Sequence, residues 1–224
     1  MQQRDILILT KKIVETISFC LIKMAMLVYD IINMVMNMIK VIAFDLVGVL
    51  VSEKDIEMSL EESKIERLFG PNKSDDEYIN DALKIINDED KLIETTYKLL
   101  TNLYEVKDNN LLNKLKTNYP NIKIVIATNH ITFIKKFINE NFDIKYLEEI
   151  FISADINKIK PNKDFYEEIV NKMSCNPSEI LFLDDNQDNI DGAKSCGLNT
   201  IKVEKNMYLF EEIEKIIFEN NMEI

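Results

Sequence analysis

Short runs of consecutive apolar residues alternate with segments of helical periodicity along most of the chain. The apolar runs are rich in Ile, Val, Leu and Phe, and they lie at 40–44, 122–128, 149–155, 179–185 and 199–204. Apolar residues at consecutive positions are typical of strands that are buried on both faces of a sheet. Helical patterns occupy 131–141, 162–174, 188–196 and 208–220. The alternation predicts an α/β fold: an open parallel sheet with helices on both faces.

The connection between the first two predicted strands is much longer than the others. Ser74 to Glu77 reads "SDDE", which is a capping box at a helix start, and residues 91–106 repeat apolar side chains at helical spacing. We therefore predict a small all-helical module inserted over 53–117, with a core domain formed by 38–52 and 118–224. Ligands of parallel sheets bind at the carboxyl ends of the strands, so the inserted module would cover the site as a cap.

Residues 1–37 are apolar but repeatedly interrupted by charged side chains. The longest uncharged stretch near their end, Ile31 to Ile39, has nine residues, whereas a membrane-spanning helix needs about 20. We interpret residues 1–37 as an N-terminal extension, helical or ill-defined, and do not expect it to span a membrane.

Charge and cysteine content exclude several classes of protein. The net charge is −12, from 27 basic and 39 acidic residues, which argues against nucleic acid as a partner because nucleic acid requires a basic face. Cys20, Cys175 and Cys196 are scattered and include no CxxC pair. This pattern predicts neither a zinc site nor disulfides, and it favours the reducing cytoplasm.

Polar residues follow four of the predicted strands. Asp45 follows the first strand and Thr128-Asn129-His130 ends the second. Lys160 comes after the third, and Asp184-Asp185 ends the fourth. Clustered carboxylates favour a hard cation such as Mg²⁺, and an aspartate beside a metal can attack phosphorus as a covalent nucleophile. A threonine hydroxyl and a lysine ammonium would bind the phosphoryl oxygens.

These residues form part of four motifs: "FDLVGVL" (44–50), "IVIATN" (124–129), "KIKPNKDFY" (158–166) and "ILFLDDNQDNIDGAKSCGL" (180–198). In this order they resemble the haloacid dehalogenase (HAD) superfamily, whose members are mostly phosphatases. The resemblance covers about 40–204, and the paired aspartates of the last motif are similar to those of one phosphatase-like subgroup. It implies a Rossmann-like core with a small helical cap between the first two motifs.

The resemblance also implies site residues, position by position. Asp45 resembles the nucleophile and a metal ligand, and Lys160 resembles the catalytic lysine that orients phosphate. Further phosphate-binding residues would be Thr128, Asn129 and Asn189. Mg²⁺ would be held by Asp45, by the backbone carbonyl of Val47, and by Asp184 and Asp185. Gly48 fits the tight turn that leads to the cap.

Val47 departs from the family pattern, because typical family phosphatases carry an aspartate there as general acid and base. This role is worth roughly 10²–10⁴-fold in rate. His130 is the only histidine and titrates near neutral pH when unperturbed, so we consider it as a substitute acid or base. A solvated loop histidine without a catalytic role is the alternative.

The resulting prediction is a Mg²⁺-dependent hydrolase of a small phosphorylated metabolite, acting through an aspartyl-phosphate intermediate. Two alternatives follow from Val47. One is a hydrolase of carbon–halogen or carbon–phosphorus bonds, since such members of the superfamily also lack this aspartate. The other is a catalytically impaired domain that binds metal and phosphate. The sequence names neither the substrate nor the oligomeric state.

Overall fold

The computed structural model describes residues 17–24, 26, 38–70 and 74–222. Two compact units are distinguished: Ile39–Ile216, and Met1–Met38 together with Ile217–Ile224. In the second unit, residues 17–24 form a helix with exposed apolar side chains. The rest of the predicted extension, 1–37, lies outside the described residues except for residue 26. No helix in the described ranges combines the length and apolarity needed to cross a membrane.

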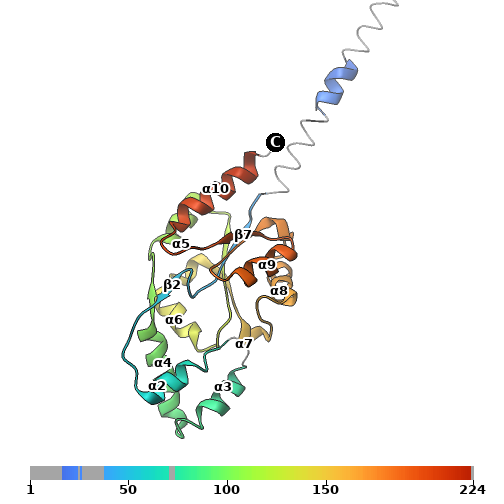
Figure 1. The fold of residues 1–224 in the computed structure, drawn as a ribbon. Helices are drawn as coiled ribbons and strands as arrows, with labels where there is room; N and C mark the ends of the chain where they lie inside the picture. The colour runs from blue at the N-terminus through green and yellow to red at the C-terminus, as the bar shows by residue number, and fades with distance from the viewer. Residues whose placement is uncertain (1–16, 25, 27–37, 71–73, 223–224) are drawn as a thin grey trace, which may run out of the picture. The chain divides into compact units, whose positions relative to one another are not determined.

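The larger unit is built on a five-stranded parallel sheet of order β5-β4-β1-β6-β7 (Figure 1). Its strands are β1 (Val41–Phe44), β4 (Lys123–Thr128), β5 (Leu147–Ile152), β6 (Ile180–Asp184) and β7 (Asn199–Lys202). Each of the five apolar runs overlaps one of these strands, so the predicted α/β parallel sheet is confirmed. The run at 149–155 ends as a strand at Ile152, where the short helix α7 begins.

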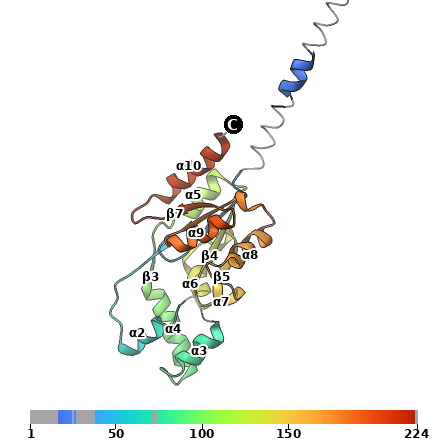
Figure 2. The same cartoon turned by 45° about the vertical axis from the view of Figure 1, so that its right-hand side comes forward.

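Helices cover both faces of the sheet. They are α5 (Leu111–Asn118), α6 (Ile134–Asn141), α8 (Lys163–Met173) and α9 (Gln187–Ser195). The short α7 (Ser153–Ile156) directly follows β5, and α10 (Leu209–Met222) follows β7 and extends beyond the larger unit, which ends at Ile216. The chain steps from β1 to β4 to β5 in one direction and then returns to β6 and β7 in the other. Right-handed crossovers therefore place α5 and α6 on one face and α8 and α9 on the opposite face (Figure 2).

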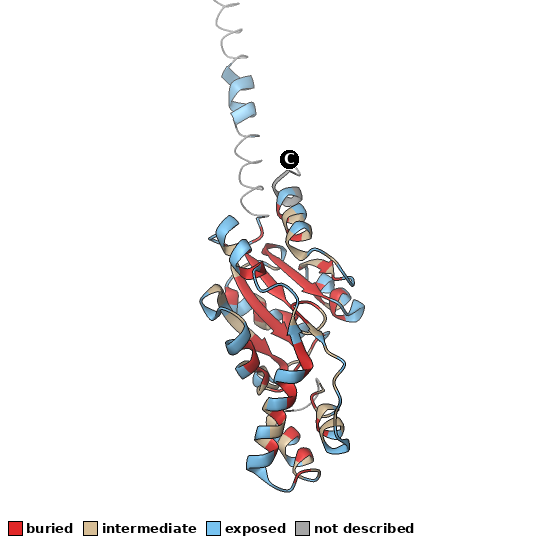
Figure 3. Ribbon diagram, turned by 90° about the vertical axis from the view of Figure 1, so that its left-hand side faces the viewer, coloured by how far each residue is buried: buried red, intermediate tan, exposed pale blue. Residues whose placement is uncertain are grey.

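The sheet forms the buried core of this unit (Figure 3). Every residue of β1 and β6, the two central strands flanking the candidate site, is buried. On the face covered by α8 and α9, Tyr166 packs edge-on against Phe182 of β6, with ring centroids 5.5 Å apart. A buried, close-packed sheet fixes the positions of the residues at its strand ends.

The segment between β1 and β4 contains α2 (Leu60–Glu66), α3 (Asp75–Ala82) and α4 (Glu89–Leu103). The capping box at Ser74 and Glu77 is present as predicted. We expected residues 53–117 to be all-helical, but β3 (Tyr104–Val106) lies within them and pairs antiparallel with β2 (Val51–Glu53). The outgoing and returning chains run side by side here, so their backbone groups pair. Three-residue strands are too short to give a recognisable alternation in the sequence.

Candidate active site

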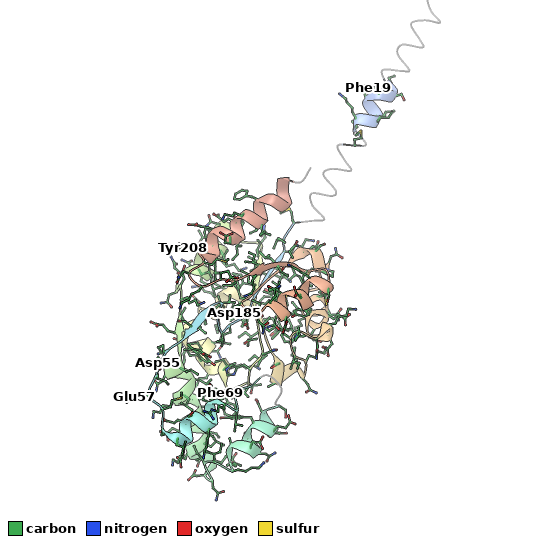
Figure 4. All side chains as sticks on the ribbon, viewed as in Figure 1. Phe19, Asp55, Glu57, Phe69, Asp185 and Tyr208 are labelled. Carbon is green, nitrogen blue, oxygen red and sulfur yellow. The ribbon has the colours of Figure 1, made fainter. Side chains whose placement is uncertain are left out.

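The predicted acids meet at the carboxyl ends of adjacent strands. Asp45 directly follows β1, and Asp184 is the last residue of β6, which pairs with β1. The Asp45 amide donates a hydrogen bond to Leu183 O at 2.8 Å. Carboxylate oxygens of Asp45, Asp184 and Asp185 all lie within 4.8 Å of one another. Asp45 and Asp184 are buried and Asp185 is exposed, so the cluster opens to solvent on the side of Asp185 (labelled in Figure 4).

Lys160 is the counter-charge of this cluster. Its Nζ lies 2.9 Å from Asp45 Oδ1 and 2.7 Å from Asp184 Oδ2, and the lysine is itself buried. Burial alone would lower the pKa of Lys160, but the two carboxylates outweigh burial and raise it. The ammonium therefore stays charged and joins the two buried acids.

The Asp45 carboxyl is less acidic than an ordinary aspartate. Burial raises its pKa to about 6, Lys160 opposes this shift, and the negative charge of Asp184 adds to it. A cation close to this group would stabilise its ionised form. Lys160 alone leaves the three acids with an excess of negative charge.

Asn189 orients Asp184 in this structure. Its Nδ2 donates to both oxygens of Asp184, at 3.1 and 3.0 Å, and the Asn186 amide donates to Oδ1 at 2.8 Å. Tyr166 Oη in turn donates to Asn189 O at 2.7 Å. The side-chain amide is thus engaged with Asp184, and the phosphate contact expected from the sequence stays a prediction.

Asn129 is likewise used for positioning. Its Nδ2 donates to Lys160 O at 2.9 Å, and the Lys160 amide donates to Asn129 Oδ1 at 3.0 Å. This amide pair fixes the backbone of Lys160 next to β4. Thr128, the last residue of β4, is buried at the same edge of the sheet, beside β1.

His130 is buried, so the alternative of a solvated loop histidine does not hold. Its Nδ1 is 3.3 Å from Ile131 O and its Nε2 is 3.1 Å from the Tyr104 hydroxyl. Burial lowers its pKa to about 4. The ring is therefore neutral at pH 7. With Nδ1–H donating to Ile131 O, Nε2 accepts from Tyr104, so both ring nitrogens are engaged within the protein. These features disfavour the acid role considered for His130.

Gly48 has a conformation and a setting that suit only glycine. Its φ is +84°, in the left-handed region, and a Cβ there would lie 2.1 Å from Asp185 Oδ2. The turn after β1 can therefore approach the Asp185 carboxylate closely. This places the backbone after Val47 beside the exposed acid of the cluster.

The insertion contacts the loop that follows β4. Phe69 (labelled in Figure 4), which follows α2, packs against the His130 ring with centroids 5.7 Å apart. Tyr78 of α3 and Tyr97 of α4 pack against Phe133. No sequence motif identifies these residues. Aromatic side chains at helical spacing give the same sequence pattern whether they pack inside the insertion or against another part of the protein.

The donor set suits Mg²⁺. Magnesium prefers oxygen ligands and is held in proteins by one or two carboxylates with several waters. Three converging carboxylates provide such ligands, and the absent Cβ of Gly48 leaves room for the Asp185 carboxylate at the rim. Among the described residues no histidine or cysteine joins this group, so a site for softer metals is not indicated.

Residues 27–203 match the family described as Haloacid dehalogenase-like hydrolase. The chain belongs to this family. Enolase-phosphatase E1 of Sulfurihydrogenibium sp. (strain YO3AOP1) is 38% identical over 95 residues, which are 41% of this chain and 41% of that protein. Bifunctional epoxide hydrolase 2 of Rattus norvegicus is 28% identical over 79 residues, 35% of this chain and 13% of that protein. The matches thus span less than half the length of these curated relatives.

Solved structures show the same fold. A predicted HAD-like family hydrolase from Porphyromonas gingivalis gives a TM-score of 0.64 at 19% identity and covers 80% of this chain and 98% of that one. A HAD family enzyme from Bacteroides thetaiotaomicron, in complex with magnesium and inorganic phosphate, gives a TM-score of 0.59 at 15% identity. The match covers 77% of this chain and 99% of that one. At these identities the likeness establishes the fold alone.

Proposed function

We propose that the chain is a Mg²⁺-dependent phosphatase of the family subgroup with paired aspartates, acting on a small phosphorylated metabolite. The observation that carries this proposal is the bridge from Lys160 to Asp45 and Asp184, with Asp185 beside them. A buried, ion-paired carboxylate at the end of a strand is held in one orientation, as a nucleophile must be. The magnesium- and phosphate-bound Bacteroides enzyme, which has the same fold, agrees with this assignment.

In the proposed reaction, an Asp45 carboxylate oxygen attacks the phosphorus of the substrate. A P–O bond forms to Asp45 as the ester P–O bond breaks, and the departing alkoxide takes up a proton from water. Water then cleaves the aspartyl-phosphate, which returns Asp45 and releases inorganic phosphate. The Thr128 hydroxyl and the Lys160 ammonium would bind the phosphoryl oxygens as negative charge develops on them.

When bound, Mg²⁺ would supply positive charge next to the transferred group. Asp45, Asp184 and Asp185 would hold it together with the Val47 carbonyl. Asn189 and Asn129 would contribute indirectly, by fixing Asp184 and the Lys160 backbone.

The insertion expected at 53–117, against a core of 38–52 and 118–224, would serve through α2, α3 and α4 as the cap that encloses the leaving group, whereas α5 (Leu111–Asn118) covers the sheet with the core. Support comes from Phe69 and Tyr104, insertion residues that contact His130 two positions after Thr128. These contacts support a position of the insertion beside the strand ends that carry the candidate site. A cap at this position would also exclude water during phosphoryl transfer.

Val47 favours a second candidate, hydrolysis of a carbon–halogen bond. A halide leaves without needing a proton, so an apolar residue at this position would carry no penalty. In that reaction Asp45 would attack carbon and form an ester, and water would then hydrolyse the ester. No phosphate and no metal would be needed.

The test is a screen of phosphorylated metabolites and haloacids with the full chain, in Mg²⁺ and in excess chelator. The phosphatase proposal expects phosphate release that stops in chelator and in Asp45→Asn. The matched control is Asp188→Asn, an exposed acid in the first turn of α9. Halide release that persists in chelator would replace the proposal by the second candidate. Mg²⁺ binding without any turnover of these substrates would indicate an impaired domain.

A further inference from the structure

Lys107 binds the turn after β1 through both its backbone and its side chain. Its amide donates to Leu50 O at 3.0 Å, and its ammonium donates to Gly48 O. Lys107 directly follows β3, so it belongs to the chain that returns from the insertion. A single residue far along the sequence thus holds two carbonyls of the turn that follows Asp45.

The same turn is confined from two other directions. The Asp185 carboxylate lies against Gly48, where a Cβ would come within 2.1 Å of its Oδ2. The Gly48 amide donates to Val51 O at 2.9 Å. The peptide that joins Val47 to Gly48 therefore has little freedom as long as Lys107 keeps the Gly48 carbonyl in place.

The metal site gives this confinement a purpose. Mg²⁺ requires nearly ideal octahedral geometry with ligands at about 2.0–2.1 Å. A backbone carbonyl is a well-placed ligand only if its turn is fixed. Since Val47 has no carboxylate, its carbonyl is the one oxygen that this position can offer. A charge-assisted hydrogen bond to the neighbouring carbonyl is a stronger restraint than a neutral one.

We propose that Lys107 is a positioning residue of the metal site: it fixes the Gly48 turn so that the Val47 carbonyl and the Asp185 carboxylate face one cation. The inference rests on the proposed function, because it assumes Mg²⁺ at the three acids. Lys107 would strengthen Mg²⁺ binding by fixing the geometry of the turn. Its positive charge next to the site would by itself weaken the binding of a cation, so the two effects on Mg²⁺ affinity have opposite signs.

Isothermal titration of Mg²⁺ into the full chain without substrate measures the effect. Lys107→Met removes the donor and the charge at nearly constant length. We expect it to weaken Mg²⁺ affinity by about tenfold, the lower end of the range for partners that orient metal ligands. Lys107→Arg keeps a charged donor and should stay within about threefold of wild type, which is under 1 kcal/mol.

Lys205→Met is the matched control. Lys205 is exposed and lines the same cavity of about 780 Å³ as Lys107, and it makes no hydrogen bond or ion pair within the described part of the chain. Its substitution removes one positive charge but leaves the turn intact, so Mg²⁺ affinity should stay the same or increase slightly. Hydrogen exchange at residues 46–51 should accelerate in Lys107→Met and not in Lys205→Met.

Equal or tighter Mg²⁺ binding by a folded Lys107→Met protein would overturn the inference and leave the proposed function intact. Should that variant not fold, Lys107→Leu, which also removes the donor and the charge, takes its place. Wild-type affinity in Lys107→Leu with wild-type exchange would overturn the inference equally. Absence of Mg²⁺ binding by the wild type would remove both this inference and the proposed function.

Discussion

Asp75 of α3 accepts two hydrogen bonds from Thr132, in the loop that follows β4. The Thr132 amide donates to Oδ1 at 2.9 Å and the Thr132 hydroxyl donates to Oδ2. Both residues are half-buried. The carboxylate therefore attaches the insertion to the loop that begins at Asn129, through Thr132, which lies four residues after the candidate phosphate-binding Thr128.

Loss of this attachment should loosen the insertion. Asp75→Ala leaves two donors of Thr132 without their acceptor, and we expect a loss of about 1–3 kcal/mol in unfolding free energy. Urea unfolding measures this loss, and hydrogen exchange should show reduced protection in α3. Asp76→Ala is the control, since Asp76 is an exposed acid in the same helical turn. Equal effects of the two substitutions would show that the Thr132 contact contributes nothing beyond the helix start.

Removal of one charge from the carboxylate cluster should weaken metal binding. Asp185→Asn keeps the shape of the side chain but removes the negative charge of the exposed member of the cluster. We expect Mg²⁺ affinity to fall by at least about tenfold, or about 1.4 kcal/mol. Calorimetry compares this variant with Asp188→Asn. Unchanged affinity in Asp185→Asn would place the metal elsewhere.

Restoring the acid that the family pattern contains should accelerate a phosphatase. Val47→Asp supplies a group that can protonate the leaving alkoxide and later deprotonate water. We expect turnover of a simple phosphomonoester to rise at least about tenfold, equivalent to about 1.4 kcal/mol of barrier. Steady-state kinetics with excess Mg²⁺ tests this, and Val47→Asn serves as the uncharged control. An equal gain in both variants would exclude proton transfer as the cause.

His130 should make folding stability depend on pH. Burial lowers its pKa from 6.5 to about 4, so the unfolded chain binds a proton at this residue before the folded chain does. The contribution of neutral His130 to the free energy of unfolding is complete above the pKa of the unfolded chain, and it is lost as pH falls from about 6.5 to about 4. Between pH 7 and pH 5 the free energy of unfolding should therefore fall by about 2 kcal/mol.

The comparison that isolates this contribution is wild type against His130→Asn, by urea unfolding at both pH values. Other groups titrate in the same range and contribute equally to both proteins. The wild type should lose more stability than the variant on acidification. Parallel losses would mean that His130 is protonated in the folded state at pH 5, and the catalytic role considered from the sequence would regain support.

The strands and the identities of the acids could be predicted from the sequence. Continuous apolar runs identify strands buried on both faces, and a parallel sheet brings its carboxyl ends to one edge. From this it follows that Asp45, Thr128 and Asp184 lie close together. The alternation of apolar runs with helical segments can be read without knowledge of side-chain contacts. It was therefore sufficient to predict the fold.

Tertiary structure alone decided how the polar side chains are used. Asn189 and Asn129 have the residue type of phosphate ligands, yet both amides bind other site residues. An amide donates and accepts equally well in either role, so its partner depends on packing. The same holds for His130, whose burial against Tyr104 sets its protonation state, and for Lys107, which reaches Gly48 across 59 positions of sequence. Sequence fixes which groups are available, and only the folded chain decides which of them meet.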